Sequence, residues 1–293
     1  MKFFVTGSAG LVGRQVTKDL VALGYQVYSS YHINKPEFGT PTHLDLTNPE
    51  NITRVIDSTS PDVIIHLAAL TNVDLCEKEK EMALLINAKA SEILSKQATR
   101  KKAFFLYVST DYVFDGEEGM KKESDTPNPV DFYGKSKLEG EKAVAESASS
   151  WCIARTSTPF GLHSEKISFP LWVIQNLEAN KEIPVVVDQF TSPTYVPNLS
   201  LMLIELCTRK IVGINHVAGR TKISRHKFAE SIAENLNLDK KLLKPVSMKD
   251  MKWFARRPKD SSLDVSKAFS ILKEKPLSID KALESFIRDI KSL

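Results

Sequence analysis

The sequence is poor in cysteine, with three cysteines among 293 residues. Cys76, Cys152 and Cys207 lie far apart and form neither a CxxC pair nor a cluster with histidine. This spacing argues against a disulfide framework and against a structural zinc site, so no metal is expected. Buried free thiols are the expected state of the three side chains.

Long apolar runs are also missing. No stretch approaches the roughly 18 uncharged apolar residues that a membrane-spanning helix needs. The first ten residues, MKFFVTGSAG, lack the long apolar segment and the cleavage site of a signal peptide. We therefore expect a cytoplasmic protein without a membrane partner.

An excess of charge of either sign is absent, because 40 basic and 36 acidic side chains leave a net charge of +4. Lysines occur in isolated pairs rather than in a basic stripe, so a nucleic-acid partner is not expected. Apolar residues make up 42% and charged residues 26% of the chain, which is typical of ordinary globular domains. The length predicts one or two such domains.

The N-terminal half alternates between short apolar runs and stretches with helical spacing. Such alternation predicts an α/β fold in which a doubly wound, Rossmann-like parallel sheet is covered by helices on both faces. The strands are expected at residues 2–5, 26–30, 62–67, 103–108 and 151–155. The helices are expected at residues 11–23, 49–57, 79–100 and about 131–146.

The composition of the sequence changes after Thr156, where prolines become frequent and the expected helices and strands become shorter. We expect an NAD(P)-binding domain over residues 1–157 and a mainly substrate-binding, mixed lobe over residues 158–293. Strands near Val185 and Ile214 are expected to return to the main sheet. The last residues, 279–293, have the spacing of an amphipathic helix.

Three glycines, Gly7, Gly10 and Gly13, separate the first predicted strand from the first predicted helix. In this position, glycines permit a tight turn and let backbone N–H groups approach a pyrophosphate at the helix N-terminus. The G-x-x-G-x-x-G spacing therefore predicts a dinucleotide site, with Leu11 and Val12 beside the ligand.

The second strand ends in Ser29-Ser30-Tyr31-His32 and carries no acidic residue, which NAD sites usually place there to hold the ribose. Arg14 and Lys35 are candidates to meet a 2′-phosphate. We therefore expect NADP (NADPH) as the cofactor, with NAD as the alternative. Asp45 and Leu46 are expected near the adenine, although Asp45 also fits a turn or helix cap.

Tyr133 and Lys137 form a Y-x-x-x-K pair on one face of a predicted helix, and Thr110 ends the strand before it. The carboxyl edge of an open α/β sheet is where ligands bind. A lysine ammonium and a nicotinamide ring are expected to lower the pKa of Tyr133 from its usual value near 10. Tyr133 would then exchange a proton with a carbonyl or alcohol, which Thr110 orients.

Several segments resemble the extended short-chain dehydrogenase/reductase family and, within it, the dTDP-4-dehydrorhamnose reductase family. The matching segments cover most of the chain, and the last two of them are absent from the superfamily in general. They are TGSAGLVG (6–13), HLAALTNVDLCE (66–77), VSTDYVFDG (108–116), YGKSKLEGE (133–141), RTS (155–157), DQFTSPTY (188–195) and RPKDSSLD (257–264).

This resemblance implies NAD(P)H-dependent reduction of the 4-keto group of a nucleotide-linked 6-deoxysugar, as in dTDP-L-rhamnose biosynthesis. It implies that Thr110, Tyr133 and Lys137 carry catalysis and that the last two also hold the cofactor. The further residues implied at the cofactor are Ala68, Ala69 and Leu70, and those implied at the sugar are Thr71, Val73, Thr110, Asp111 and Tyr112.

One position departs from the family pattern, because Thr158 stands where the family usually has tryptophan after Arg-Thr-Ser. This departure leaves the nucleotide base and the sugar open. A homodimer is also left open.

The same sequence features leave two other functions open. The regulatory β-subunit of methionine adenosyltransferase, a non-catalytic NADP-binding protein, resembles the same family, and a nucleotide-sugar epimerase is a further alternative. A dehydratase is disfavoured because Asp111 is followed by Tyr112 rather than by glutamate. His66 lies in an apolar strand and is expected to be a packed core residue.

Overall fold

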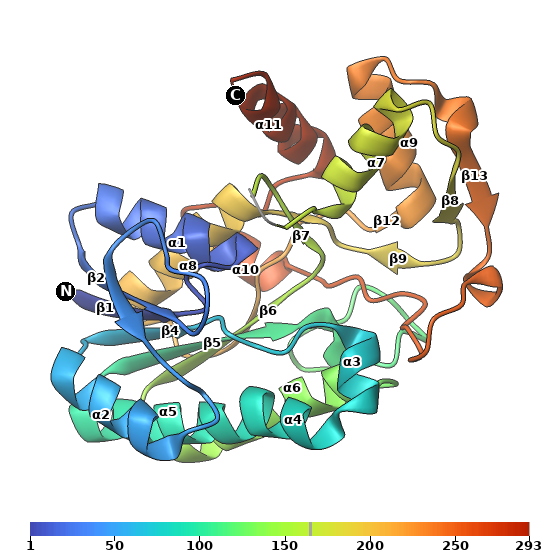
Figure 1. Ribbon diagram of the computed structural model, residues 1–293. Helices are drawn as coiled ribbons and strands as arrows, with labels where there is room; N and C mark the ends of the chain where they lie inside the picture. Colours follow the sequence, from blue (N-terminus) through green and yellow to red (C-terminus); the bar gives the residue numbers. More distant parts are fainter. Residues whose placement is uncertain (164–165, 293) are drawn as a thin grey trace.

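The apolar segments of the N-terminal half form a parallel β-sheet in the computed structural model, which describes residues 1–163 and 166–292 (Figure 1). The strand order is β11-β6-β5-β4-β1-β2-β3, and every neighbouring pair is parallel. The predicted doubly wound fold is confirmed. The strands are β1 (Lys2–Thr6), β2 (Gln26–Tyr31), β3 (Thr40–His43), β4 (Val63–His66), β5 (Phe104–Thr110), β6 (Trp151–Thr156) and β11 (Gly213–His216).

Helices cover both faces of this sheet, as Figure 1 shows. One face packs against α1 (Leu11–Ala22), α8 (Val196–Thr208) and α10 (Ser266–Ile271). The other face packs against α2 (Pro49–Thr59), α5 (Ala90–Lys101) and α6 (Phe132–Ser147). Successive strand residues serve opposite faces, so Phe3 and Val5 join the first core while Phe4 joins the second. Burial on both faces explains why these strands read as continuous apolar runs.

The segment between β4 and β5 differs from the single helix that the spacing predicts over residues 79–100. It consists of α3 (Val73–Lys78), α4 (Lys80–Leu84), a π-helical turn (Leu85–Lys89) and α5. The edge strand β3 was not predicted either, because its sequence, Thr-Pro-Thr-His, is polar and contains a proline. An edge strand tolerates that proline, since one side of the strand forms no ladder.

The second lobe is built mainly from residues after β6 and lies beside the carboxyl edge of the sheet (Figure 1). Its core surrounds Phe160, whose ring contacts those of Phe228 and Phe286. Its helices are α7 (Phe169–Glu178), α9 (Arg225–Leu236) and α11 (Ile279–Lys291). Its strands are β7 (Pro159–Phe160), β8 (Ile183–Val186), β9 (Phe190–Thr191), β10 (Thr194–Tyr195), β12 (Ile223–Ser224) and β13 (Leu243–Val246). Over residues 1–163 and 166–292, the 3-10 turns are Asp111–Val113, Lys240–Leu242 and Met248–Asp250.

Two strands of the C-terminal half were expected to return to the main sheet. The strand at Ile214 does so, because β11 pairs with β6. The expectation for Val185 is wrong, since β8 pairs with β13 in a separate two-stranded sheet. β8 follows α7 and packs into the core of the second lobe, which keeps it away from the main sheet.

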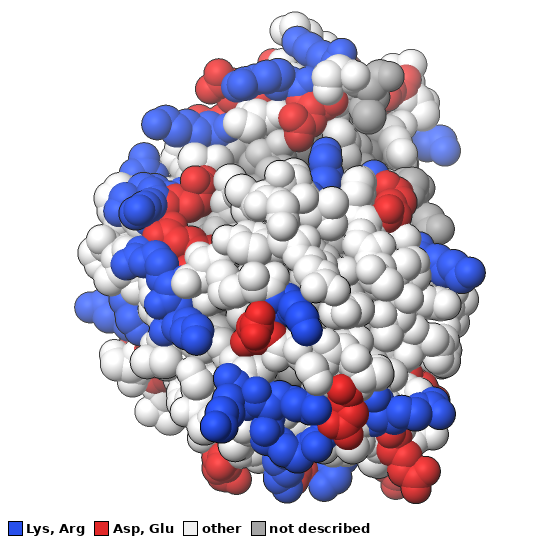
Figure 2. Space-filling model, turned by 90° about the vertical axis from the view of Figure 1, so that its left-hand side faces the viewer, with Lys and Arg blue, Asp and Glu red and all other residues white. Residues whose placement is uncertain are grey.

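Charged residues of both signs are interleaved on the face shown in Figure 2, above and below a broad area that carries few of them. No helix within the described residues is long and apolar enough to cross a membrane. Over the same residues, no group of three or more His, Cys, Asp or Glu side chains is arranged to hold a metal ion.

A buried ion pair connects α6 to the end of β6. Arg155 Nε and Nη2 donate to the two carboxylate oxygens of Glu141 at 2.9 and 2.6 Å, and both side chains are under 5% exposed. The guanidinium also lies 5.1 Å from the ring centre of Phe114. Such a pair is stabilising only as a unit, because removing one partner leaves the other charge buried and uncompensated.

We expect Glu141→Gln to lower the free energy of unfolding by about 3–5 kcal/mol, since Arg155 would keep its charge without a counter-ion. Urea denaturation followed by circular dichroism measures this change. The matched control is Glu139→Gln on the same helix, which breaks an exposed pair with Lys142 and should change stability by less than about 1 kcal/mol. Equal effects of the two variants would contradict this account of the buried pair.

Candidate active site

The glycine turn between β1 and α1 leaves no room for side chains. A Cβ added to Gly13 would lie 2.1 Å from the carbonyl oxygen of Gly7, and Gly7 itself has a φ of 69°. Helix α1 starts at Leu11 without a side-chain cap at Gly10, so its first N–H groups are free to meet an anion. The turn therefore has the shape and the donors that a pyrophosphate requires.

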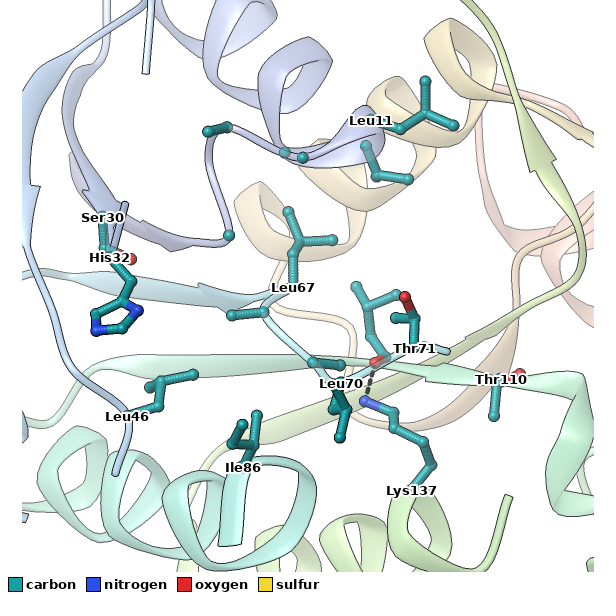
Figure 3. Close-up of a pocket in the computed structure, with 18 of the residues that line it drawn as sticks. Leu11, Ser30, His32, Leu46, Leu67, Leu70, Thr71, Ile86, Thr110 and Lys137 are labelled. Carbon is teal, nitrogen blue, oxygen red and sulfur yellow. Dashed lines mark hydrogen bonds between the residues drawn. The ribbon is translucent and has the colours of Figure 1, made fainter. Parts of the chain in front are cut away.

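A cavity of about 920 Å³ begins at this turn and runs along the carboxyl edge of the sheet (Figure 3). Ser30 and His32 lie at one end of it, while Thr110 and Lys137 lie at the other. The predicted cofactor and catalytic residues converge on its wall from separate parts of the chain. The lining includes Gly7, Gly10, Leu11, Val12, Gly13, Asp45, Leu46, Ala68, Ala69, Leu70, Thr71, Thr110, Asp111, Tyr133 and Lys137.

The described residues that line this cavity do not include two of the residues implied at the sugar, Val73 and Tyr112. Val73 begins helix α3. The Tyr112 ring stands edge-on to that of Tyr133 at 5.9 Å, and burial raises the pKa of Tyr112 to about 12. Their roles at the sugar stay predictions.

The end of the cavity near β2 is lined by Ser30, His32 and Asn34. Arg14, a candidate for a 2′-phosphate, instead forms a two-pronged ion pair with Glu37 at 2.9 and 2.7 Å. This hydrogen-bonded pairing lowers the pKa of Glu37. Lys35, the other candidate, does not line the cavity among the described residues.

Asp45 lines the same end and also stabilises its own turn. Its Oδ1 accepts hydrogen bonds from the backbone N–H and the hydroxyl of Thr47 at 2.8 and 2.7 Å. These bonds lower the pKa of Asp45. The capping role and the place at the cavity are therefore compatible.

Helix α6 carries Tyr133 and Lys137 into the cavity. Its first turn is fixed by Asp131, whose side chain accepts from the Gly134 N–H at 2.8 Å. Lys137 is 2% exposed, and its ammonium donates to the Val108 carbonyl oxygen at 2.9 Å (dashed in Figure 3). It also lies 3.9 Å from the ring centre of Tyr107. Burial lowers the pKa of Lys137 to about 7, while nearby Glu141 opposes this shift.

Burial raises the pKa of Tyr133 above its usual range in the folded chain, and the Thr110 side chain opposes this shift only in part. The cause is that desolvation of a phenolate outweighs the favourable contacts, while the Lys137 ammonium is bonded to the Val108 carbonyl. The phenol therefore stays protonated at neutral pH. The lowered pKa that the sequence predicts for this phenol beside a lysine ammonium and a nicotinamide ring stays a prediction.

Asn87 was missed by sequence reasoning, and it fixes the cavity wall. It lies fully buried in the π-helical turn. Its amide exchanges hydrogen bonds with the backbone N–H and carbonyl of Leu70 at 2.8 and 3.0 Å and donates to Ser136 on α6 at 2.9 Å. π-turns occur often at functional sites. The available signal was a polar residue inside an otherwise helical apolar pattern.

Lys166 was also missed. Its Nζ lies 3.8 Å from the position that a Cβ on Gly10 would take, and the residue lines the cavity. It comes from the second lobe, far from the glycine turn in sequence, so spacing gave no signal. His66 matches its prediction, since it is fully buried between Thr6 and Ser91, and burial lowers its pKa to about 3.

Comparison with known proteins identifies the family of the chain. A family model described as the RmlD substrate binding domain matches residues 1–292. The chain belongs to this family. The predicted resemblance is thereby confirmed, and the fold agrees with that of a solved relative. The dTDP-4-dehydrorhamnose reductase from Bacillus anthracis in complex with NADP superposes with a TM-score of 0.88 at 31% identity, covering 98% of this chain and 99% of that one.

Of three further relatives, two are named as reductases and one as a subunit of methionine adenosyltransferase. A probable low-salt glycan biosynthesis reductase, Agl14, from Haloferax volcanii is 36% identical over 91% of this chain and 90% of its own length. The dTDP-4-dehydrorhamnose reductase of Aggregatibacter actinomycetemcomitans is 33% identical over 97% of both chains. Methionine adenosyltransferase 2 subunit beta from Xenopus tropicalis is 33% identical over 90% of this chain and 80% of its own length.

We expect Gly13→Ala to abolish dinucleotide binding, because the new methyl group would meet the Gly7 carbonyl and open the turn. Fluorescence titration with NADPH measures the affinity, and circular dichroism checks the fold. Gly24→Ala is the matched control, since nothing lies within 4 Å of a Cβ there and only its φ of 79° is strained. Unchanged NADPH affinity in Gly13→Ala would contradict the assignment of the turn.

Proposed function

We propose that the protein is an NADPH-preferring reductase of the 4-keto group of a nucleotide-linked 6-deoxysugar. One observation carries the proposal. Thr110, Tyr133 and Lys137 together line one cavity, which starts at a glycine turn fit for a pyrophosphate. The names of the reductase relatives support the same class of reaction.

The side chains fit a reduction. A bound reduced nicotinamide supplies the hydride. The phenol of Tyr133 holds its proton at neutral pH and is thus ready to donate it to a carbonyl oxygen that gains negative charge. Thr110, which lines the same cavity, would hydrogen-bond that oxygen and hold it in place. Lys137, anchored by the Val108 carbonyl, would hold the ribose hydroxyls of the cofactor.

The preference for NADPH is supported by the residues at the end of β2. Ser30 and His32 line the cavity where an NAD site usually carries a carboxylate. Arg14 is paired with Glu37 and would have to leave it to reach a 2′-phosphate. The preference for NADPH is therefore supported by the missing acid and by His32, and not by Arg14.

A non-catalytic NADP-binding subunit is the alternative that a specific finding favours, because a methionine adenosyltransferase subunit is among the relatives. A binding protein has no need of the three residues Thr110, Tyr133 and Lys137 in one cavity wall, so their joint presence favours an enzyme. An epimerase stays a weaker alternative, which would retain its cofactor through turnover. The expected cytoplasmic location rests on the sequence alone and stays a prediction.

The proposal is tested with a panel of nucleotide-linked 4-keto-6-deoxysugars, including the dTDP-linked compound, and with NADPH and NADH at equal concentrations. We expect loss of absorbance at about 340 nm with at least one keto-sugar, faster with NADPH. Clear preference for NADH would contradict the cofactor assignment. Tight NADPH binding without turnover of any substrate would contradict the reductase and favour the binding subunit. Size-exclusion chromatography of the same preparation tests for a homodimer.

Tyr133→Phe is expected to lower kcat by about 10²–10⁴-fold, which is the contribution of a positioned proton donor. NADPH affinity should stay nearly unchanged, because the ring still fills its place beside Tyr112. Stopped-flow turnover and fluorescence titration of the same preparation give both numbers. Turnover at the unaltered rate would show that another group donates the proton.

A further inference from the structure

Lys166 is an exposed residue in the segment that leads into α7 of the second lobe. It nevertheless lines the cavity, and its ammonium nitrogen lies 3.8 Å from the position that a Cβ on Gly10 would take. Gly10 directly precedes α1, whose first N–H groups receive no side-chain cap. The second lobe therefore places a positive charge against the glycine turn between β1 and α1.

His163 connects the backbone of this segment to the same turn. Its Nε2 lies 3.0 Å from the Ala9 carbonyl oxygen, and its Nδ1 lies 3.1 Å from the backbone nitrogen of Lys166. A carbonyl oxygen only accepts and a backbone N–H only donates, so the ring donates through Nε2 and accepts at Nδ1. One neutral tautomer of the imidazole satisfies both hydrogen bonds. The ring thus links the glycine turn to the backbone that carries Lys166.

The other side of the segment is anchored in the core of the second lobe. The Ser168 hydroxyl donates to the Gly161 carbonyl oxygen at 3.0 Å. The Phe169 ring contacts those of Trp172 and Phe228, with ring centres 6.0 and 5.5 Å apart. The backbone of Lys166 is therefore held between the glycine turn and the core of the second lobe.

The charges along the cavity wall show what this ammonium can bind. Among the described residues that line the cavity, Lys137 and Lys166 are the only lysines or arginines. Lys137 lies at the Thr110 end and donates to the Val108 carbonyl oxygen (Figure 3). Lys166 has no ion-pair partner within residues 1–163 and 166–292. A pyrophosphate at the glycine turn is a dianion, which the N–H groups of a helix match with only a partial positive charge.

We propose that Lys166 binds the pyrophosphate of the dinucleotide from the second lobe, opposite the N–H groups of α1. The inference rests on the dinucleotide site of the function proposed above and adds a residue that the glycine spacing does not identify. The lysine ammonium donates to phosphate oxygens as a point charge and needs no fixed angle of approach. Dinucleotide binding therefore joins the two lobes at the glycine turn.

Lys166→Met keeps a long side chain and removes its charge. We expect the affinity for NADPH to fall about tenfold, which is the contribution of one hydrogen bond to a charged group. NADH and ADP-ribose should lose affinity by the same factor, because both contain the pyrophosphate and lack the 2′-phosphate. Fluorescence titration measures the two reduced dinucleotides, and isothermal titration calorimetry measures ADP-ribose.

Two further variants separate the charge from the fold. Lys181→Met removes another exposed lysine of the second lobe, which is not among the described residues that line the cavity, and should change each affinity by less than about twofold. Lys166→Arg keeps the charge and should restore most of the lost affinity. Added salt should weaken NADPH binding more in the wild-type protein than in Lys166→Met, because salt screens the attraction between ammonium and phosphate. Circular dichroism checks the fold of all three variants.

Each outcome of these titrations decides the inference. If Lys166→Met binds NADPH, NADH and ADP-ribose as tightly as Lys181→Met does, the inference is overturned. A loss confined to NADPH would place the ammonium at the 2′-phosphate and would also overturn it. So would an increased KM for the keto-sugar at unchanged dinucleotide affinity, because that result would place the ammonium at the substrate.

The same measurements separate this inference from the proposed function. The titrations contain no keto-sugar, so a wild-type protein that binds NADPH through Lys166 but reduces no keto-sugar of the panel would end the proposed reductase and leave this inference standing. A wild-type protein that reduces a keto-sugar with unaltered dinucleotide affinity in Lys166→Met would do the reverse. If the wild-type protein binds neither dinucleotide, both fail together.

Discussion

Parallel pairing of the strands is the constraint on which the site depends. Because β1, β2, β4, β5 and β6 run in the same direction, their carboxyl ends meet along one edge of the sheet. That edge gathers the glycine turn, the stretch around Leu70, Thr110 with Asp111, and Ser157. None of these segments is adjacent to another in sequence, so the parallel sheet brings them together. Tyr133 and Lys137 from α6 and Lys166 from the second lobe complete the wall.

Polar groups buried beneath this edge hold the cavity residues in place. Lys137 is fixed by a main-chain carbonyl and an aromatic ring, and Asn87 ties the Leu70 backbone to α6. Thr158, which also lines the cavity, has a strained backbone, because a β-branched residue rarely adopts a φ of 40°. Buried polar networks of this kind define one arrangement when their members are satisfied. These hydrogen bonds fix the position of the Lys137 ammonium and of the Leu70 backbone at the cavity.

Much of this arrangement could be predicted from the sequence, and the exceptions have physical causes. The glycine spacing and the Y-x-x-x-K pair are local patterns, so they locate the turn and the helix that carries Tyr133 and Lys137 into the cavity. The π-turn at Asn87, the Arg14–Glu37 pair and the place of Lys166 depend on contacts between distant segments, which periodicity does not encode. The burial that raises the pKa of Tyr133 in the chain itself is likewise a property of the folded protein.

The central claim is that the cavity holds a dinucleotide with its nicotinamide beside Tyr133, and a crystal structure of the protein with NADPH tests it most directly. We expect the pyrophosphate on the first N–H groups of α1, the Lys137 ammonium within hydrogen-bond distance of the nicotinamide ribose, and the Tyr133 phenol facing the ring. A nicotinamide outside this cavity, or a Tyr133 phenol turned away from it, would contradict this claim.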